Sequence, residues 1–97
     1  MNYYLLSYDL VDDYITRRAS LRDQHLRLAR EAYARGEIIL AGAFTDPADA
    51  AALVFHAPGQ SVVEEFVRND PYVLNGLVKQ WKIRLWNVVI GDQKSPV

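Results

Sequence analysis

The spacing of apolar residues divides the chain into segments of two kinds. In the first kind, apolar residues are nearly continuous or alternate with polar ones, and aromatic and branched side chains are frequent, which is typical of strands. This pattern predicts four strands, over 3–10, 37–44, 51–57 and 78–90. The turn sequence TDPADA separates the second strand from the third.

The second kind of segment carries apolar residues at the 3.6-residue period of a helix. The first helix is expected over 21–35, with a start as early as Thr16 and with Gly36 as its C-cap. Its core-facing side is expected to contain Leu21, Leu26, Leu28, Ala29, Ala32 and Tyr33. A second helix is expected after Ser61, which would cap it, and it must end before Pro71. The PYVLNGL segment that follows is expected to be a loop or short turn.

These elements follow the order βαββαβ, which is the ferredoxin-like α+β arrangement with a four-stranded antiparallel sheet. The 97 residues are expected to form one domain, 1–97, with a frayed polar tail over 91–97. Two helices cover only one face of such a sheet, yet the strands are apolar on both faces, as Leu5 and Leu6 illustrate. Monomers rarely expose a large apolar patch. We therefore expect a homodimer that packs sheet against sheet.

Composition and charge narrow the classes of partner. The net charge of −1 does not favour nucleic acid or an anionic membrane. The chain has no cysteine, which excludes disulfides, thiol catalysis and thiolate metal sites. No apolar run approaches the ~18 residues of a membrane span, and MNYYLLSYDL lacks the basic start of a signal peptide. We expect a cytoplasmic protein without nucleic-acid or membrane partners.

Three basic side chains lie on the apolar side of the first predicted helix. Arg18, Arg22 and His25 are spaced i, i+4 and i+7, which places them in one row along a helix. A buried cation without a partner is costly, and arginine does not lose its proton. Either carboxylates of the sheet pair with this row, or the row lines a pocket for an anionic or polar ligand.

Structural roles compete with a ligand role for each of these residues. Arg18 lies near the helix start, where its guanidinium can reach water, and Arg22 can pair with Asp9 at the end of the first strand. His25 can be a core histidine whose hydrogen bonds are satisfied. Asp70 is held at a rigid corner by the proline that follows it, although Asp-Pro is also a common turn pair.

The ordered motifs RxxxRxxHL, AGAF and DPY resemble the YciI-like family. The resemblance extends from YYLLSYD through the last strand, which ends in WNVVI, and it implies a dimeric α+β barrel of ferredoxin-like subunits. Two features depart from the family pattern. Ala43 follows the glycine of AGAF where the family often has proline, and the loop TDPADAAA is short. Both lie near the expected pocket rim, so the resemblance leaves the substrate open.

The resemblance also implies which residues form the site. The His–Asp pair that the family is thought to use in a cleft corresponds to His25 and Asp70 in this chain. The further positions that match the family, as substrate-binding residues, are Arg18, Arg22, Ser20 and Asp9. A few relatives are linked to the removal of HCl from chlorinated aromatic-ring metabolites.

Together these observations predict a small-molecule enzyme without a cofactor. His25 would be a general base or acid, because imidazole exchanges protons near neutral pH, and Asp70 would orient it. The two arginines would hold an enolate, carboxylate or phenolate oxygen, and Ser7, Tyr8 and Trp86 are expected in the pocket wall. The expected reaction is elimination or isomerisation of a small polar, cyclic or aromatic-derived metabolite.

Other chemistries are less well supported by the sequence. No HxxxH or HxH spacing brings His25 and His56 together, so no metal site is expected, and His56 is expected at the surface. No glycine-rich phosphate motif is present. The alternative to an enzyme is a non-catalytic module that binds a small metabolite or serves as an accessory subunit. In that case His25 and Asp70 would hold two elements together.

Overall fold

The computed structural model describes residues 1–91 and contains a four-stranded antiparallel sheet. The strands are β1 (Asn2–Leu10), β2 (Ile38–Ala43), β3 (Ala50–Ala57) and β4 (Val78–Trp86), in the order β2-β3-β1-β4. The helical segments are α1 (Tyr14–Arg17), the 3-10 turn η1 (Arg18–Ser20), α2 (Arg22–Ala34), α3 (Gln60–Asn69) and α4 (Pro71–Leu74). This is the predicted βαββαβ order with added short helices. The frayed tail expected over 91–97 lies, from residue 92 on, outside the described residues.

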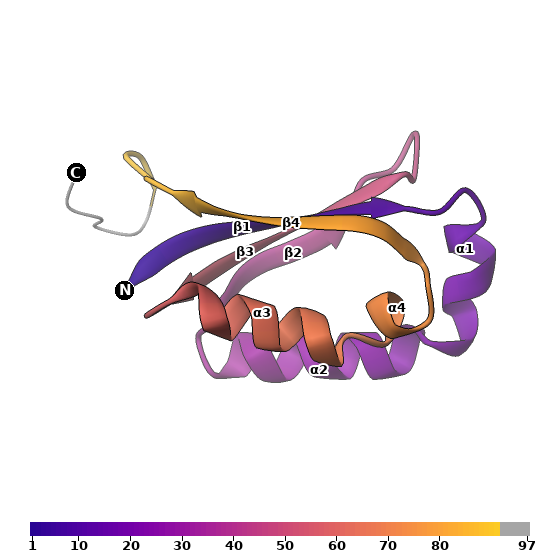
Figure 1. Ribbon diagram of the computed structural model, residues 1–97, viewed down its shortest axis with the longest axis horizontal. Coiled ribbons are helices and arrows are strands. Elements are labelled where there is room, and N and C mark those ends of the chain that lie inside the picture. The colour runs from indigo at the N-terminus through magenta and orange to yellow at the C-terminus, as the bar shows by residue number, and fades with distance from the viewer. Residues whose placement is uncertain (92–97) are drawn as a thin grey trace.

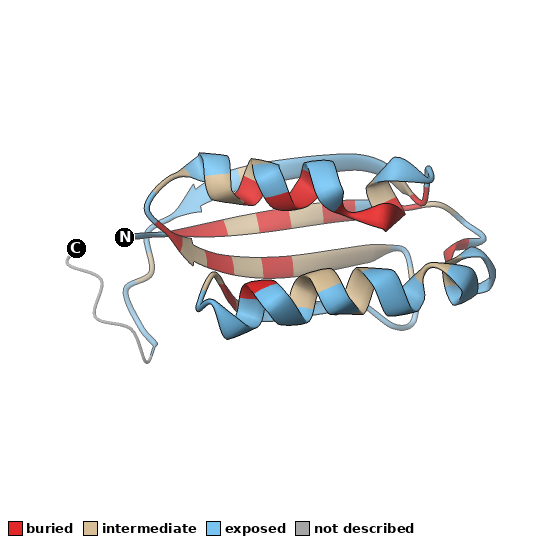
Figure 2. Ribbon diagram, turned by 90° about the horizontal axis from the view of Figure 1, so that it is seen from below, coloured by how far each residue is buried: buried red, intermediate tan, exposed pale blue. Residues whose placement is uncertain are grey.

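The helices lie on one side of the sheet and leave its other face open (Figure 1). Along β1 the residues that face the helices are buried, namely Tyr4, Leu6, Tyr8 and Leu10. Figure 2 shows the matching alternation of buried and less buried positions along the central strands. From α3 the core receives Val63, Phe66 and Val67. The core is therefore a single layer between the sheet and the helices, as the two-residue period of the strands requires.

The first predicted helix is divided by the 3-10 turn η1. Thr16 is helical as predicted, but it lies in α1, and α2 begins only at Arg22. The Leu21 amide donates to the Arg18 carbonyl at 2.9 Å, a bond three residues back. Figure 1 shows α1 turned away from the axis of α2. Arg18 therefore does not share a continuous helix with Arg22 and His25.

The buried side of α2 is narrower than the sequence predicted. Ala32 is buried, and Leu21, Leu28 and Ala29 pack partly against the core. Tyr33 is 64% exposed, so its predicted place in the core is wrong. Tyr33 follows Ala32 by one residue, and one residue is about 100° of rotation around a helix. That rotation carries its side chain out of the core.

Three other boundaries differ from the prediction. Gly59, in an extended conformation, precedes α3, so Ser61 lies inside the helix and is not its cap. The expected loop after Asp70 forms the short helix α4, because the Asp70 side chain accepts from the Tyr72 amide and caps it. Strand β4 ends at Trp86 and not at residue 90, because Trp86 pairs with Tyr3 near the start of β1 and little partner strand remains beyond it.

Candidate active site

A pocket of about 410 Å³ opens between α1, α2 and the strands β2 and β3. Its lining is largely apolar and aromatic, and the polar or basic side chains that interrupt it are Tyr8, Tyr14, Arg18, Arg22, His25, Thr45 and Tyr72. Within the described part of the chain no acidic side chain lines it. Its size suits a small metabolite, and its charge suits one that carries an anionic oxygen.

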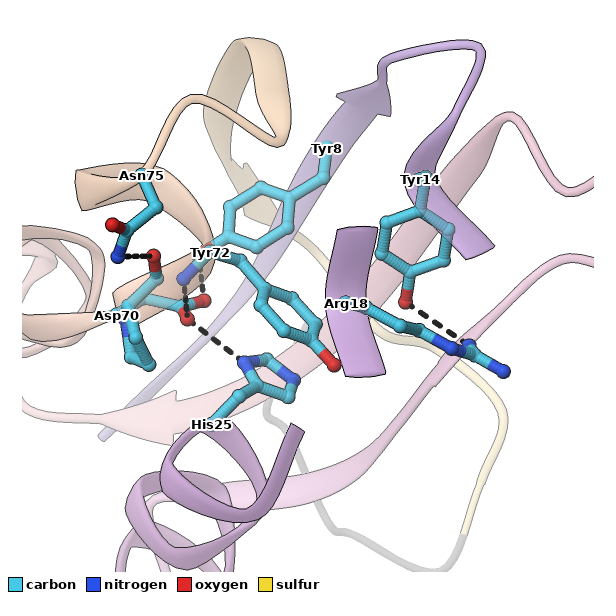
Figure 3. A network of polar contacts seen from close by, with 8 residues as sticks. Tyr8, Tyr14, Arg18, His25, Asp70, Tyr72 and Asn75 are labelled. Atoms are coloured by element: carbon cyan, nitrogen blue, oxygen red, sulfur yellow. Dashed lines mark hydrogen bonds and ion pairs between the residues drawn. The ribbon is translucent and has the colours of Figure 1, made fainter. Parts of the chain in front are cut away.

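His25 lines this pocket and is brought together with Asp70, which lies buried behind it and does not line the pocket (Figure 3). The Nδ1 atom of His25 lies 2.8 Å from Oδ1 of Asp70, although the two residues are 45 positions apart. Position 25 lies in α2, and position 70 lies between α3 and α4. Because a carboxylate only accepts hydrogen bonds, His25 donates from Nδ1. In the neutral imidazole this leaves Nε2 as the basic nitrogen.

Asp70 is fully buried and its two oxygens accept from three donors. Oδ1 accepts from His25 and from the Tyr72 amide at 3.0 Å, and Oδ2 accepts from the Tyr8 hydroxyl at 2.7 Å. Burial, followed by the negative charge of Asp70 and the hydrogen bond donated to it, raises the pKa of Tyr8 above its ordinary value. Tyr8 therefore stays a neutral donor, and the carboxylate is fixed in position from three elements.

The imidazole of His25 is also held by its face. It stacks on the Tyr72 ring with centroids 3.9 Å apart and planes inclined by 8°. The Tyr72 ring in turn meets the Tyr14 ring edge-on at 5.7 Å. The His25 side chain is 15% exposed and lines the pocket. The ring orientation is thus set by one hydrogen bond and one stacking contact, and its remaining edge is available to a ligand.

The two arginines lie at the same pocket in different ways. Arg18 is half-buried, donates to the Tyr14 hydroxyl at 3.3 Å and lies over the Tyr14 ring, with 5.2 Å between its Cζ and the ring centroid. Arg22 is exposed, so it is not part of a buried row, but it lines the pocket, which was one of the two alternatives expected for this row. The alternative pairing of Arg22 with Asp9 is not among the ion pairs of the described residues. Both guanidinium groups are available to an anion.

Four other predicted site residues lie away from the pocket. Ser7 and Asp9 project from the open face of β1, because neighbouring side chains of a strand point to opposite faces and Tyr8 faces the helices. Ser20 is exposed in η1 and does not line the pocket. Trp86 pairs with Tyr3 on the same open face. These residues therefore do not contact a ligand in this pocket of the single chain.

The pocket residues that were not identified from the sequence include two tyrosines. Tyr14 precedes Arg18 by four residues, a spacing at which two helical side chains meet, and this signal was present in the sequence. Tyr72 follows Asp70 by two residues, but its stacking on His25 depends on the helix α4, which was predicted as a loop.

Within residues 1–91 no group of three or more His, Cys, Asp or Glu side chains has the geometry to hold a metal ion. None of the helices in that range is long and apolar enough to cross a bilayer.

The fold of the chain is similar to that of several solved structures. It is similar to 5-chloro-2-hydroxyhydroquinone dehydrochlorinase from Burkholderia phenoliruptrix AC1100, solved in complex with 2,5-dihydroxybenzoquinone. The TM-score is 0.74 at 20% identity, over 87% of this chain and 92% of that one. A protein of Agrobacterium tumefaciens has a TM-score of 0.57 at 13% identity, over 89% and 91%.

A third similar structure, from Deinococcus radiodurans, is named after antibiotic biosynthesis monooxygenases; its TM-score is 0.57 at 14% identity, over 97% of this chain and 98% of that one. These likenesses confirm the ferredoxin-like α+β fold. The search of curated proteins gives no match. The family model described as the YCII-related domain matches residues 1–87. The chain therefore belongs to the family of YCII-related domains.

Proposed function

We propose that this protein is a cofactor-independent enzyme that transfers a proton to or from a small ring metabolite, in an elimination or isomerisation. The observation that carries the proposal is the 2.8 Å contact between Nδ1 of His25 and Oδ1 of Asp70 beside a pocket of about 410 Å³. A histidine oriented in this way presents Nε2 as a base. The absence of acidic side chains from the described pocket lining supports an anionic or strongly polar substrate.

In the proposed mechanism, Nε2 of His25 accepts a proton from the substrate. Asp70 holds the imidazole through Nδ1 and stabilises the imidazolium that forms. The negative charge left on the substrate collects on an oxygen that faces Arg18 and Arg22, where fixed cations stabilise it. When the leaving group is on an aromatic ring, the imidazolium delivers this proton to the ring carbon that carries the leaving group. Loss of a second hydroxyl proton to water then expels the leaving group as an anion and leaves a quinone.

The similar Burkholderia structure supports a ring substrate with acidic hydroxyl groups. That protein is a dehydrochlorinase of a chlorinated hydroxyhydroquinone and was solved with 2,5-dihydroxybenzoquinone. Such a ring matches a pocket with aromatic walls and two guanidinium groups, because a flat anion can stack on the former and pair with the latter. For this chain we take 5-chloro-2-hydroxyhydroquinone as the test substrate and 2,5-dihydroxybenzoquinone as the ligand probe.

The test is release of chloride from 5-chloro-2-hydroxyhydroquinone by the purified protein. We expect turnover by the wild type and a loss of about 100-fold or more in His25→Gln, because general acid–base catalysis contributes at least that much. Arg27→Gln is the control, since Arg27 lies on the same helix but is exposed and does not line the pocket. Wild-type turnover that is unchanged in His25→Gln contradicts the assigned role of His25.

A second candidate function is a non-catalytic module that binds the same class of ligand. One observation favours it: Asp70 caps α4 and also contacts β1 and α2, so the His25 contact has a structural use of its own. The chloride assay separates the two functions. A binding module binds 2,5-dihydroxybenzoquinone but leaves the chlorinated substrate unconsumed, at the rate seen in buffer.

We also propose that the protein forms a homodimer through the open face of its sheet. That face carries a group of apolar and aromatic side chains, Tyr3, Leu5, Leu40, Val54, His56 and Trp86. Leu40 and Trp86 are both exposed in the single chain. A second copy would cover this patch without blocking the pocket, which lies on the helix side.

A further inference from the structure

The hydroxyl of Tyr72 is a buried polar group for which the proton-transfer mechanism has no use. Tyr72 is 2% exposed, and its hydroxyl makes no hydrogen bond of good geometry with a described residue. The neighbouring Tyr14 hydroxyl raises the pKa of Tyr72 but accepts its hydrogen bond from Arg18. The ring itself is fully engaged, since it stacks on His25 and meets Tyr14 edge-on. Buried hydroxyls are nearly always paired, because an unpaired one loses its water without compensation. The unpaired hydroxyl therefore calls for a partner that the free chain does not supply.

The position of Tyr72 indicates where that partner would be. Tyr72 lines the pocket together with His25, Arg18 and Arg22. In Figure 3 its phenol extends past the imidazole of His25 towards Tyr14 and Arg18. The hydroxyl thus lies where the proposed mechanism places the charged oxygen of the substrate. The other buried hydroxyl without a partner, that of Tyr3, does not line this pocket.

The electrostatic surroundings keep Tyr72 protonated, so its hydroxyl can donate a hydrogen bond. Burial and the neighbouring Tyr14 raise the pKa of Tyr72 to about 12, although the charges of Arg22 and Arg18 act in the opposite direction. The phenol therefore keeps its proton at physiological pH. The same arginines leave a positive field at this end of the pocket, so the oxygen that accepts the hydrogen bond from Tyr72 is expected to be an anionic one.

We propose that the Tyr72 hydroxyl is a specificity-determining donor that binds an anionic ring oxygen of the substrate beside His25. The inference rests on the proposed function, because it takes the substrate to be the ring anion argued above. Tyr72 would select for a ring with an oxygen at that position. A site built around a buried donor rejects analogues that lack the matching oxygen, since the donor is then left unpaired.

The experiment compares Tyr72→Phe with the wild type in calorimetric binding of 2,5-dihydroxybenzoquinone and in urea unfolding without ligand. Phenylalanine keeps the ring that stacks on His25 and removes only the hydroxyl. We expect affinity to fall about 10-fold to 100-fold, the usual effect of losing a hydrogen bond to a charged group. We expect the urea midpoint to stay the same or rise, because the hydroxyl has no partner in the free protein. Tyr33→Phe, at an exposed tyrosine outside the pocket, should change neither quantity.

Three results would overturn the inference. The first is equal affinity of Tyr72→Phe and the wild type. The second is a wild type that does not bind the probe, because the inference names its ring oxygen as the partner. The third is a clear loss of stability or failure to fold in Tyr72→Phe, which would show that the hydroxyl already has a partner. Failure of the proposed function has a different signature. In that case His25→Gln releases chloride at the wild-type rate, while Tyr72→Phe still binds 2,5-dihydroxybenzoquinone more weakly than the wild type.

Discussion

Asp70 shows how one side chain can determine the geometry of the site. Its oxygens contact Tyr8 of β1, His25 of α2 and the first turn of α4, so each contact constrains the other two. A buried carboxylate is tolerated only when its hydrogen-bonding capacity is used, and three donors do this here. The carboxylate is fully buried, so it acts on a ligand only through His25.

The Tyr8 hydroxyl makes the protein sensitive to alkali. The pKa of Tyr8 is raised above the ordinary 10.0, chiefly by burial, so the folded protein keeps this proton at pH values where the unfolded chain has lost it. Its contribution to stability is complete below pH 10 and is lost as the pH rises further, by up to ~1.4 kcal/mol per pH unit for one proton. The pKa of Tyr72 is also raised, to about 12, so its titration likewise lowers the stability of the folded protein as the pH rises from 10 to 12.

Urea unfolding from about pH 9 to about pH 11 measures this effect. We expect Tyr8→Phe to lower the free energy of unfolding near neutral pH by ~1–3 kcal/mol, because Oδ2 of Asp70 loses its donor. We also expect the free energy of unfolding to fall less steeply with pH in the alkaline range, by the slope that corresponds to about one proton. Tyr33→Phe should keep the wild-type slope, since Tyr33 is exposed. Equal slopes for Tyr8→Phe and the wild type would contradict the account of Tyr8.

Part of the site was predictable from individual residues of the sequence. His25 lay on the apolar side of a helix and Asp70 at a proline corner, and the family motifs named both. Ser7 and Asp9 could not line the same wall as Tyr8, because adjacent strand residues point to opposite faces, and this signal was available. The partner of Tyr8 was not predictable, because no local pattern links it to a residue 62 positions away.

At the scale of elements, glycines end two of the helices. Gly36 and Gly76 both have positive φ, at 81° and 77°. The amides of Gly36 and Glu37 bond to the carbonyls of Tyr33 and Ala32, and the same pattern recurs at Gly76. These are Schellman motifs, in which glycine adopts the left-handed conformation at low cost. The one after α4 fixes the helix that carries Tyr72.

Replacing Gly76 by alanine should therefore destabilise the protein. We expect a loss of ~1–2 kcal/mol, since a side chain is disfavoured in the left-handed region. Gly59→Ala is the control, because the backbone there is extended and a methyl group meets nothing within 4 Å. Thermal and urea unfolding of the two variants measure the difference. Similar stabilities for Gly76→Ala and Gly59→Ala would show that the turn after α4 does not depend on glycine.

Most elements could be predicted from periodicity, whereas their breaks could not. The four strands and two main helices follow from alternating and 3.6-residue patterns, and Gly36 is confirmed as the end of α2. The 3-10 turn η1 interrupts a segment whose pattern is helical throughout, so periodicity does not reveal it. The helix α4 depends on the Asp70 cap, and a four-residue helix has too few residues to show a period.

At the scale of the molecule, the open face of the sheet predicts a dimer. Sedimentation equilibrium at micromolar concentration should give about twice the chain mass. Leu40→Glu should shift the protein towards monomer, because Leu40 pairs with Val54 on that face and a carboxylate there would be buried on association. Leu74→Glu, at an equally exposed leucine on α4, is the control and should stay dimeric. A wild-type monomer would contradict the proposed dimer.

In the proposed site, His25 presents a basic Nε2 to the pocket because Asp70 holds the proton on Nδ1. Nitrogen-15 NMR of histidine-labelled protein reports which ring nitrogen carries the proton in the neutral imidazole. We expect the Nδ1–H form of His25 in the wild type. In Asp70→Asn we expect a shift towards the Nε2–H form, because the asparagine amide can donate to Nδ1. A wild-type His25 with its proton on Nε2 would contradict the account, because the nitrogen that faces the ligand could not then act as the base.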